Sequence, residues 1–153
     1  MQRDQVAEFE ACLIGRSCAI ERREHDWTFG LSEGIGLAVS APWRIVSAGR
    51  IAFASQDDGE MFGLKSPVDG EAEARMHIGS KAITAVMLDR ETADLQLHFD
   101  AGTRIDMFNN SMGYEGWQAD YVIHDKRWSL IVMGGGEVLF VAGPAWLFFR
   151  RSL

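Results

Sequence analysis

Residues 26–39 read DWTFGLSEGIGLAV, and residues 94–107 read DLQLHFDAGTRIDM. In both segments, apolar side chains alternate with polar or small ones on either side of a short turn. The turn contains Gly34 in the first segment and Gly102 in the second. A period of two places the apolar residues on one face of a strand. Each segment therefore predicts a β-hairpin with a three-residue loop and a left-handed glycine.

The two hairpins also align with each other. When Asp26 is placed on Asp94, the apolar positions of the first hairpin fall on apolar positions of the second, and the turn glycines coincide. A segment with a helical pattern precedes each hairpin, and a strand led by Trp43 or Trp117 follows it. The pattern indicates an internal duplication with halves at about residues 4–59 and 67–141. A chance match between two amphipathic hairpins explains it equally well, because two-residue periodicity is common.

The remaining segments are mostly short and strand-like. A helix is expected over residues 4–13, where Val6, Phe9 and Leu13 share one face. A second helix is expected from Ser66 to about Met76, with Ser66 as N-cap and Pro67 in the first turn. Residues 82–88 are almost wholly apolar and predict a central strand covered on both faces.

These elements predict a mainly β protein, with α+β as the alternative class. We expect about ten short, mostly antiparallel strands in a sandwich or partly open barrel, with two short helices. The length of 153 residues is typical of a single domain spanning 1–153. A high glycine count with only 3 prolines fits tight hairpin turns within ladders.

Charge and cysteine content narrow the possible partners and compartments. A net charge of -7 disfavours a nucleic-acid binder, because phosphate contacts need a basic surface. The first five residues lack the apolar core of a signal peptide, and the apolar run 138–149 is too short to span a membrane. Cys12 and Cys18 match no metal or redox spacing and are expected to be free thiols. We therefore expect a cytoplasmic protein without membrane contacts.

Catalytic motifs are not evident in the sequence. Neither cysteine lies in a nucleophile motif, and no G-x-S-x-G sequence is present. His98 and Asp100 would share one strand face and could form half of a metal site, but a solvent-facing histidine is favoured. We expect no catalytic residue, metal or cofactor, and the lack of a catalytic motif favours a non-enzymatic protein over an enzyme.

The least ordinary segment is 109–117, which concentrates amides and aromatic rings. It contains the candidate binding residues Asn109, Asn110, Tyr114, Glu115 and Trp117. Rigid rings supply contact area and amides supply hydrogen bonds, so such loops make good recognition surfaces. The structural alternative is that Trp117 starts a core strand while its neighbours lock the turn.

The hairpin from Asp94 to Gly102, followed by Tyr114-Glu115-x-Trp117, resembles a family of small bacterial β-rich domains of unknown function. Several of those domains are similar to immunity proteins of bacterial toxin systems. The resemblance implies a non-enzymatic binding protein, such as an immunity-type inhibitor, and offers no catalytic residues to carry over. An acidic inhibitor would suit a basic toxin as partner, because complementary charge steers association.

Two other functions remain open from the sequence. One is a small-molecule binder or enzyme with a pocket between the two halves. The other is a homodimer that uses the apolar tail 145–149 as its interface.

Overall fold

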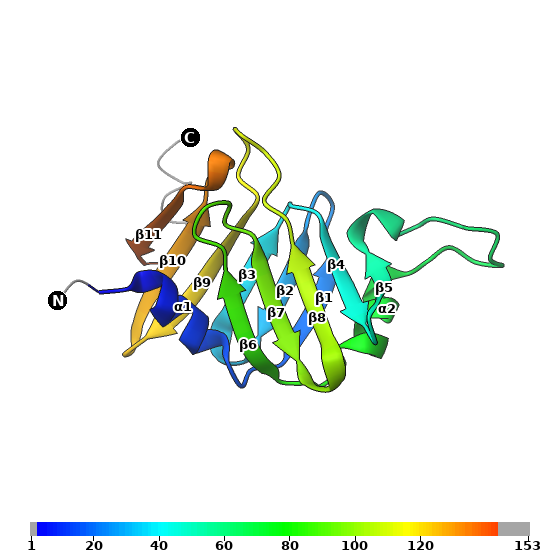
Figure 1. Ribbon diagram of the computed structural model, residues 1–153, viewed down its shortest axis with the longest axis horizontal. Coiled ribbons are helices and arrows are strands. Elements are labelled where there is room, and N and C mark those ends of the chain that lie inside the picture. Colours follow the sequence, from blue (N-terminus) through cyan, green and yellow to red (C-terminus); the bar gives the residue numbers. More distant parts are fainter. Residues whose placement is uncertain (1–2, 144–153) are drawn as a thin grey trace.

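The computed structural model describes residues 3–143, which form two antiparallel sheets packed face to face (Figure 1). The larger sheet comprises, in spatial order, β1 (Cys18–Arg22), β2 (Trp27–Leu31), β3 (Ile35–Val39), β9 (Trp117–Ile123), β10 (Lys126–Val132) and β11 (Val138–Ala142). The smaller sheet comprises β5 (Arg50–Ala54), β4 (Trp43–Ser47), β8 (Thr103–Met107), β7 (Leu95–Phe99) and β6 (Ile83–Leu88). The predicted mainly β sandwich with two short helices is confirmed.

The two helices cover the sides of the sandwich (Figure 1). Helix α1 (Gln5–Leu13) begins where the Asp4 carboxylate accepts a hydrogen bond from the Ala7 amide at 3.1 Å. Helix α2 (Gly70–His77) begins later than expected. Its N-cap is Asp69, whose carboxylate accepts from the amides of two first-turn residues, so Ser66 lies outside the helix.

The two predicted hairpins are present, as β2–β3 and β7–β8. Their turns have the same backbone geometry, because two successive residues take positive φ in each. These are Glu33 at 65° and Gly34 at 77° in one turn, and Ala101 at 62° and Gly102 at 72° in the other. The left-handed region is costly for most side chains, which explains the glycine at the second position.

The order of elements in residues 5–54 recurs in residues 70–132. Each segment runs through a helix, a three-stranded meander in one sheet and a two-stranded hairpin in the opposite sheet. The meander β1–β2–β3 is extended by β9–β10, and the meander β6–β7–β8 is extended by β4–β5. The contacts between the meander of one segment and the hairpin of the other also correspond. Val39 pairs with Trp117 in the larger sheet, and Met107 pairs with Trp43 in the smaller sheet. Each sheet is therefore built from both segments.

The core lies between the sheets and is rich in aromatic rings. Trp43 is buried and meets Trp27 and Phe29 edge to face, with ring centroids 5.1 Å apart in both pairs. Phe9 of α1 packs against Trp117 and Tyr121 on the other side. These contacts bind the helix and both sheets into one cluster.

The strand at 83–88 differs from the sequence prediction. It is an edge strand, β6, not a central one, and Thr84, Ala85 and Met87 on it are exposed. Apolar composition alone did not distinguish a strand covered on two faces from one covered on a single face.

No helix within residues 3–143 is long and apolar enough to cross a membrane. The tail 145–149, which the sequence suggests as a dimer interface, lies outside the described residues.

Gly70 provides a test of the packing between α2 and the aromatic core. A Cβ at this position would lie 2.6 Å from Cζ of Phe53 and 2.7 Å from Cη2 of Trp27. Alanine normally stabilises a helix relative to glycine, but overpacking costs more, so Gly70→Ala should lower the free energy of unfolding by about 1–3 kcal/mol. Urea denaturation measures this change.

Gly113→Ala is the matched control, because its Cβ would meet nothing within 4 Å. We expect a change within about 0.5 kcal/mol for this variant. Equal stability of the Gly70→Ala variant and the unsubstituted chain would contradict the described packing at the start of α2.

Candidate functional site

The loop between β8 and β9 carries the predicted binding residues, and Asn109 holds its base. The Asn109 amide donates to the Asp94 carboxylate at 2.8 Å, and its side-chain nitrogen donates to the carbonyls of Thr92 at 2.9 Å and Met133 at 3.3 Å. Asn109 thus joins three segments that are distant in the sequence. Its side-chain oxygen is buried against Gly116, where a Cβ would clash with it. Asn109 therefore has a structural role.

Trp117 is also structural. Its side chain is only 2% exposed, and its indole nitrogen donates to the Ala93 carbonyl at 3.0 Å. As the first residue of β9 it lies in the core beside Phe9. The sequence alternative in which Trp117 starts a core strand fits these contacts.

The other predicted residues, Asn110, Tyr114 and Glu115, are exposed. Tyr114 is 83% exposed, and the nearby Met112 is 94% exposed. The Glu115 carboxylate makes no hydrogen bond or ion pair within the part of the chain that the structure describes. The loop therefore presents an aromatic ring, a thioether and an unpaired carboxylate to solvent.

The backbone beneath these side chains is locked. The Ser111 hydroxyl accepts hydrogen bonds from the amides of Gly113 at 3.2 Å and Tyr114 at 2.9 Å. The Ser111 carbonyl accepts from the Gly135 amide at 2.8 Å, which ties the loop to the turn before β11. Because its backbone is already ordered, such a loop loses little conformational entropy when it binds a partner.

The loop is much longer than its counterpart in the first segment. The chain crosses from β3 to β4 through residues 40–42 alone, whereas it crosses from β8 to β9 through residues 108–116. The two crossings touch, because the amides of Ser40 and Ala41 donate to the Gly116 carbonyl at 2.9 and 2.8 Å. The additional residues of the second crossing are not needed to connect the sheets.

A groove adjoins this loop and extends from the outer face of the larger sheet to residues 55–58, which follow β5. Three neighbouring hollows share Arg23 as a lining residue, and we call their union the Arg23 groove. Its floor is formed by small residues of β2 and β3, namely Gly30, Gly36 and Ala38. Glu115 lines the hollow nearest the loop. The predicted loop and the groove thus form one continuous surface.

Charged groups of both signs border the groove. Arg23 donates two short hydrogen bonds to Asp26, at 2.6 and 2.5 Å, and this carboxylate raises the pKa of the Arg23 guanidinium. Across the groove, the Ser129 hydroxyl donates to the Asp120 carboxylate at 2.7 Å. Arg127 lines the groove without an ion pair to another described residue.

Sequence reasoning missed the groove, although its floor left a signal. Gly30 and Gly36 lie opposite each other within β2 and β3, and glycine inside a strand pattern often marks a close approach of another chain or ligand. Arg23 and Arg127 carry no motif, so only the fold reveals that they border the same surface.

The side chains suited to catalysis are dispersed. In residues 3–143, no group of three or more His, Cys, Asp or Glu side chains has the arrangement of a metal site. Three histidine rings lie beside a polar side chain of their own segment: His25 beside Glu24, His77 beside Glu73 and His98 beside Gln96. No family model matches the chain, and no curated protein or solved structure matches it.

Asn109→Ala tests the structural role of the loop base. Removing the amide leaves two carbonyls without their donor, so we expect the free energy of unfolding to fall by about 1–3 kcal/mol. The adjacent Asn110→Ala is the matched control, since Asn110 is exposed, and should change it by less than about 0.5 kcal/mol. Denaturant titration that finds equal effects for both would refute the distinction.

The reactivity of the two thiols tests whether they are buried. Burial raises the pKa of Cys18 to about 12 and that of Cys12 to about 11. Both groups then stay protonated at pH 8, where only the thiolate reacts with Ellman's reagent. We expect negligible reaction of the folded chain at pH 8 and release of colour only after unfolding in urea. Rapid reaction of either thiol in the native protein would contradict these positions.

Proposed function

We propose that the protein is a non-enzymatic binding protein whose contact surface is the loop 109–116 together with the Arg23 groove. The observation that carries the proposal is the additional chain at the second crossing, which exposes Tyr114 on a locked backbone. Tyrosine is enriched among the residues that dominate binding energy, and it has few rotamers to lose. A rigid loop with an exposed tyrosine is well suited to recognise another protein.

The loop end of this surface fits a partner protein with a positively charged contact region. Glu115 offers an unpaired carboxylate beside Tyr114, and the whole chain has a net charge of -7. Opposite charge speeds association and disfavours acidic competitors. We extend the proposal to an immunity-type inhibitor of a basic toxin, acting in the cytoplasm. The segment 94–117 resembles small bacterial domains that are similar to immunity proteins, and this resemblance also implies a binding protein.

The packing of the core gives less support to a small-molecule site between the two halves. The inward side chains of both sheets, including Trp43, Trp117 and Tyr121, are buried against one another in one cluster. This packing favours a contact surface on the outside of the sandwich over a pocket between the halves.

Site-specific photo-cross-linking tests the proposed surface. Tyr114 is replaced by benzoyl-phenylalanine in the full chain, produced in the native host, and the cells are irradiated. We expect a discrete adduct with a basic protein, and at least 10-fold weaker binding of that partner to a Tyr114→Ala chain. Binding should also weaken as salt is raised, because screening reduces attraction between exposed charges.

Ile51 is the control position, since it is 60% exposed on β5 of the other sheet. The photo-reactive residue at Ile51 should not give the same adduct. Absence of an adduct from position 114, or an identical adduct from both positions, would refute the proposed surface.

A further inference from the structure

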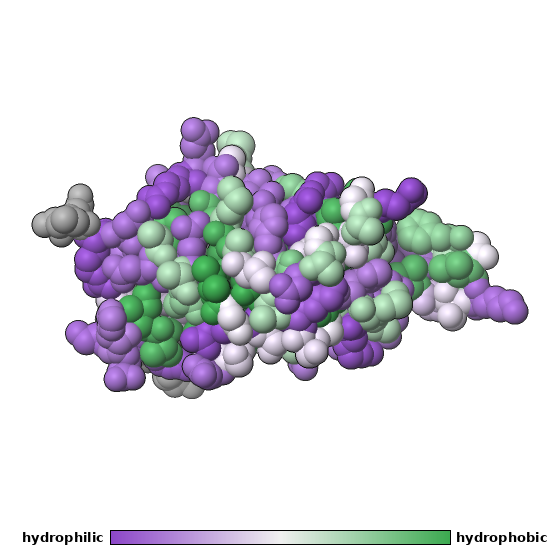
Figure 2. Space-filling view, turned by 60° about the horizontal axis from the view of Figure 1, so that its bottom comes forward, coloured by the Kyte–Doolittle hydropathy of each residue, from purple (hydrophilic) through white to green (hydrophobic). Residues whose placement is uncertain are grey.

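An apolar arm projects from one end of the sandwich. It comprises residues 59–68 and extends away from β5 and α2 (Figure 1). Three apolar side chains near its tip are exposed: Met61 at 46%, Phe62 at 66% and Leu64 at 56%. Hydrophobic residues gather on this arm at the right-hand end of the molecule in Figure 2. A cluster of this kind is typical of an interaction site.

The arm has a fixed shape. The amide of Gly59 donates to the Val68 carbonyl, and the amide of Val68 donates to the Glu60 carbonyl, both at 2.8 Å. At the tip, the Leu64 amide donates to the Met61 carbonyl at 2.7 Å. Phe62 has a φ of 44°, a conformation that costs a bulky residue free energy.

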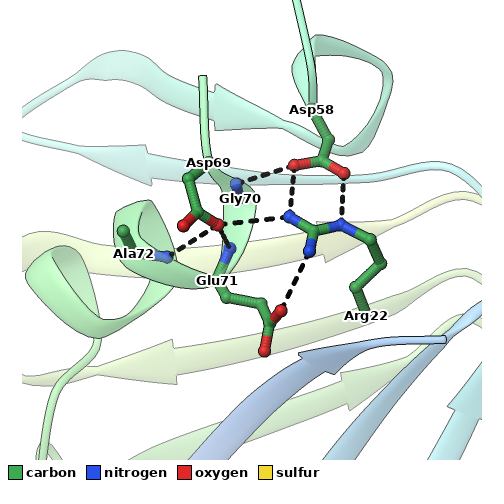
Figure 3. A network of polar contacts seen from close by, with 6 residues as sticks. All are labelled: Arg22, Asp58, Asp69, Gly70, Glu71 and Ala72. Atoms are coloured by element: carbon green, nitrogen blue, oxygen red, sulfur yellow. Dashed lines mark hydrogen bonds and ion pairs between the residues drawn. The ribbon is translucent and has the colours of Figure 1, made fainter. Parts of the chain in front are cut away.

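The base of the arm is clamped by Arg22 of β1 (Figure 3). Its guanidinium donates to the Asp58 carboxylate at 2.5 and 2.7 Å, to Glu71 at 2.9 Å and to Asp69 at 3.1 Å. Asp58 and Asp69 flank the arm, so one arginine holds both of its ends, and it lowers the pKa of the Asp58 carboxyl. The arm is therefore presented in one orientation.

A hollow that suits the arm lies on the same chain, beside α2. It measures about 610 Å³, and we call it the β1–α2 hollow. Small residues line it: Ala19 of β1, Gly30 of β2, Ala74 of α2 and Gly79 just after α2. No residue of the arm contributes to this lining, and the arm points away from its own sandwich (Figure 1). The hollow therefore has no occupant from the arm of its own chain.

The charges around the arm and the hollow are complementary. Glu60 and Lys65 flank the apolar tip of the arm, and Glu21 and Arg75 line the hollow. None of these four side chains forms an ion pair within the described residues. Pairing Glu60 with Arg75 and Lys65 with Glu21 would place the apolar tip between them.

We propose that two copies of the chain exchange their arms, with Met61, Phe62 and Leu64 of each copy seated in the β1–α2 hollow of the other. Helix α2 follows the arm directly and also lines the hollow, so donor and acceptor lie close together on each copy. This proximity is what a closed two-fold dimer requires, because the same surface serves both partners. The hollow borders the Arg23 groove, because Gly30 lines both. The exchange depends on Phe62 and Ala19 and not on Tyr114, so the dimer does not rest on the proposed function.

Sedimentation equilibrium between about 1 and 100 μM tests the exchange. The unsubstituted chain should reach the mass of a dimer, and Phe62→Asp should raise the dimer dissociation constant at least 10-fold. Met87→Asp is the matched control, since Met87 is 59% exposed on β6, far from the arm in the sheet order, and should leave the constant unchanged. A monomer at 100 μM would overturn the proposal.

Substitution of the acceptor separates arm-to-hollow exchange from arm-to-arm contact. Ala19→Arg should fill the hollow and weaken the dimer as Phe62→Asp does. A mixture of the two variants should recover part of the dimer, because the intact arm of one fits the intact hollow of the other. An Ala19→Arg chain that dimerises normally, or a mixture that stays monomeric, would overturn the assignment of the hollow. Circular dichroism verifies that each variant is folded.

Discussion

The structure depends on the two points at which the chain crosses from one sheet to the other. Strand β9 leaves the meander that precedes it and pairs with β3, while β4 leaves its own meander and pairs with β8. A buried tryptophan begins each crossing strand, at Trp43 and Trp117. Neither sheet is complete without strands from both segments, so the core cannot form from either segment alone. The loop 109–116 leaves the sandwich at one of these crossings, whereas the arm follows the hairpin β4–β5.

Local sequence patterns predicted the elements better than their arrangement. The hairpins could be read because alternating apolar residues and a turn glycine are local signals. The pairing of β3 with β9 could not be predicted, because no local sequence pattern specifies which distant strand a hairpin will pair with. The same limit applies to β6, whose apolar sequence is compatible with either an edge or a central strand. The start of α2 was misplaced because Ser66 and Asp69 are both good N-caps, and only tertiary contacts choose between them.

The candidate site, like the fold, was only partly predictable from the sequence. The segment 109–117 was recognisable by its composition, but composition treats Trp117 and Tyr114 alike. The fold separates them, since Trp117 has its indole nitrogen bonded inside the core and Tyr114 has its ring in solvent. The Arg23 groove arises from the absence of side chains at Gly30 and Gly36, and its charged rim is assembled from separate elements. Whether a residue can contact a partner depends on its burial and on its neighbours in the fold. Local sequence patterns do not reveal either of these.

The crossed connections have a consequence for how the chain acquires its structure. Strands β4 and β5 leave the ribosome long before β8, the strand against which β4 must pair. Until β8 emerges, the hairpin β4–β5 exposes an unpaired edge and the apolar face of Trp43, and such surfaces favour aggregation. Contacts between distant residues also make closure slow, because a long loop must be ordered before they form. A nascent chain of this topology would benefit from a chaperone that shields the first hairpin until its partner strand is synthesised.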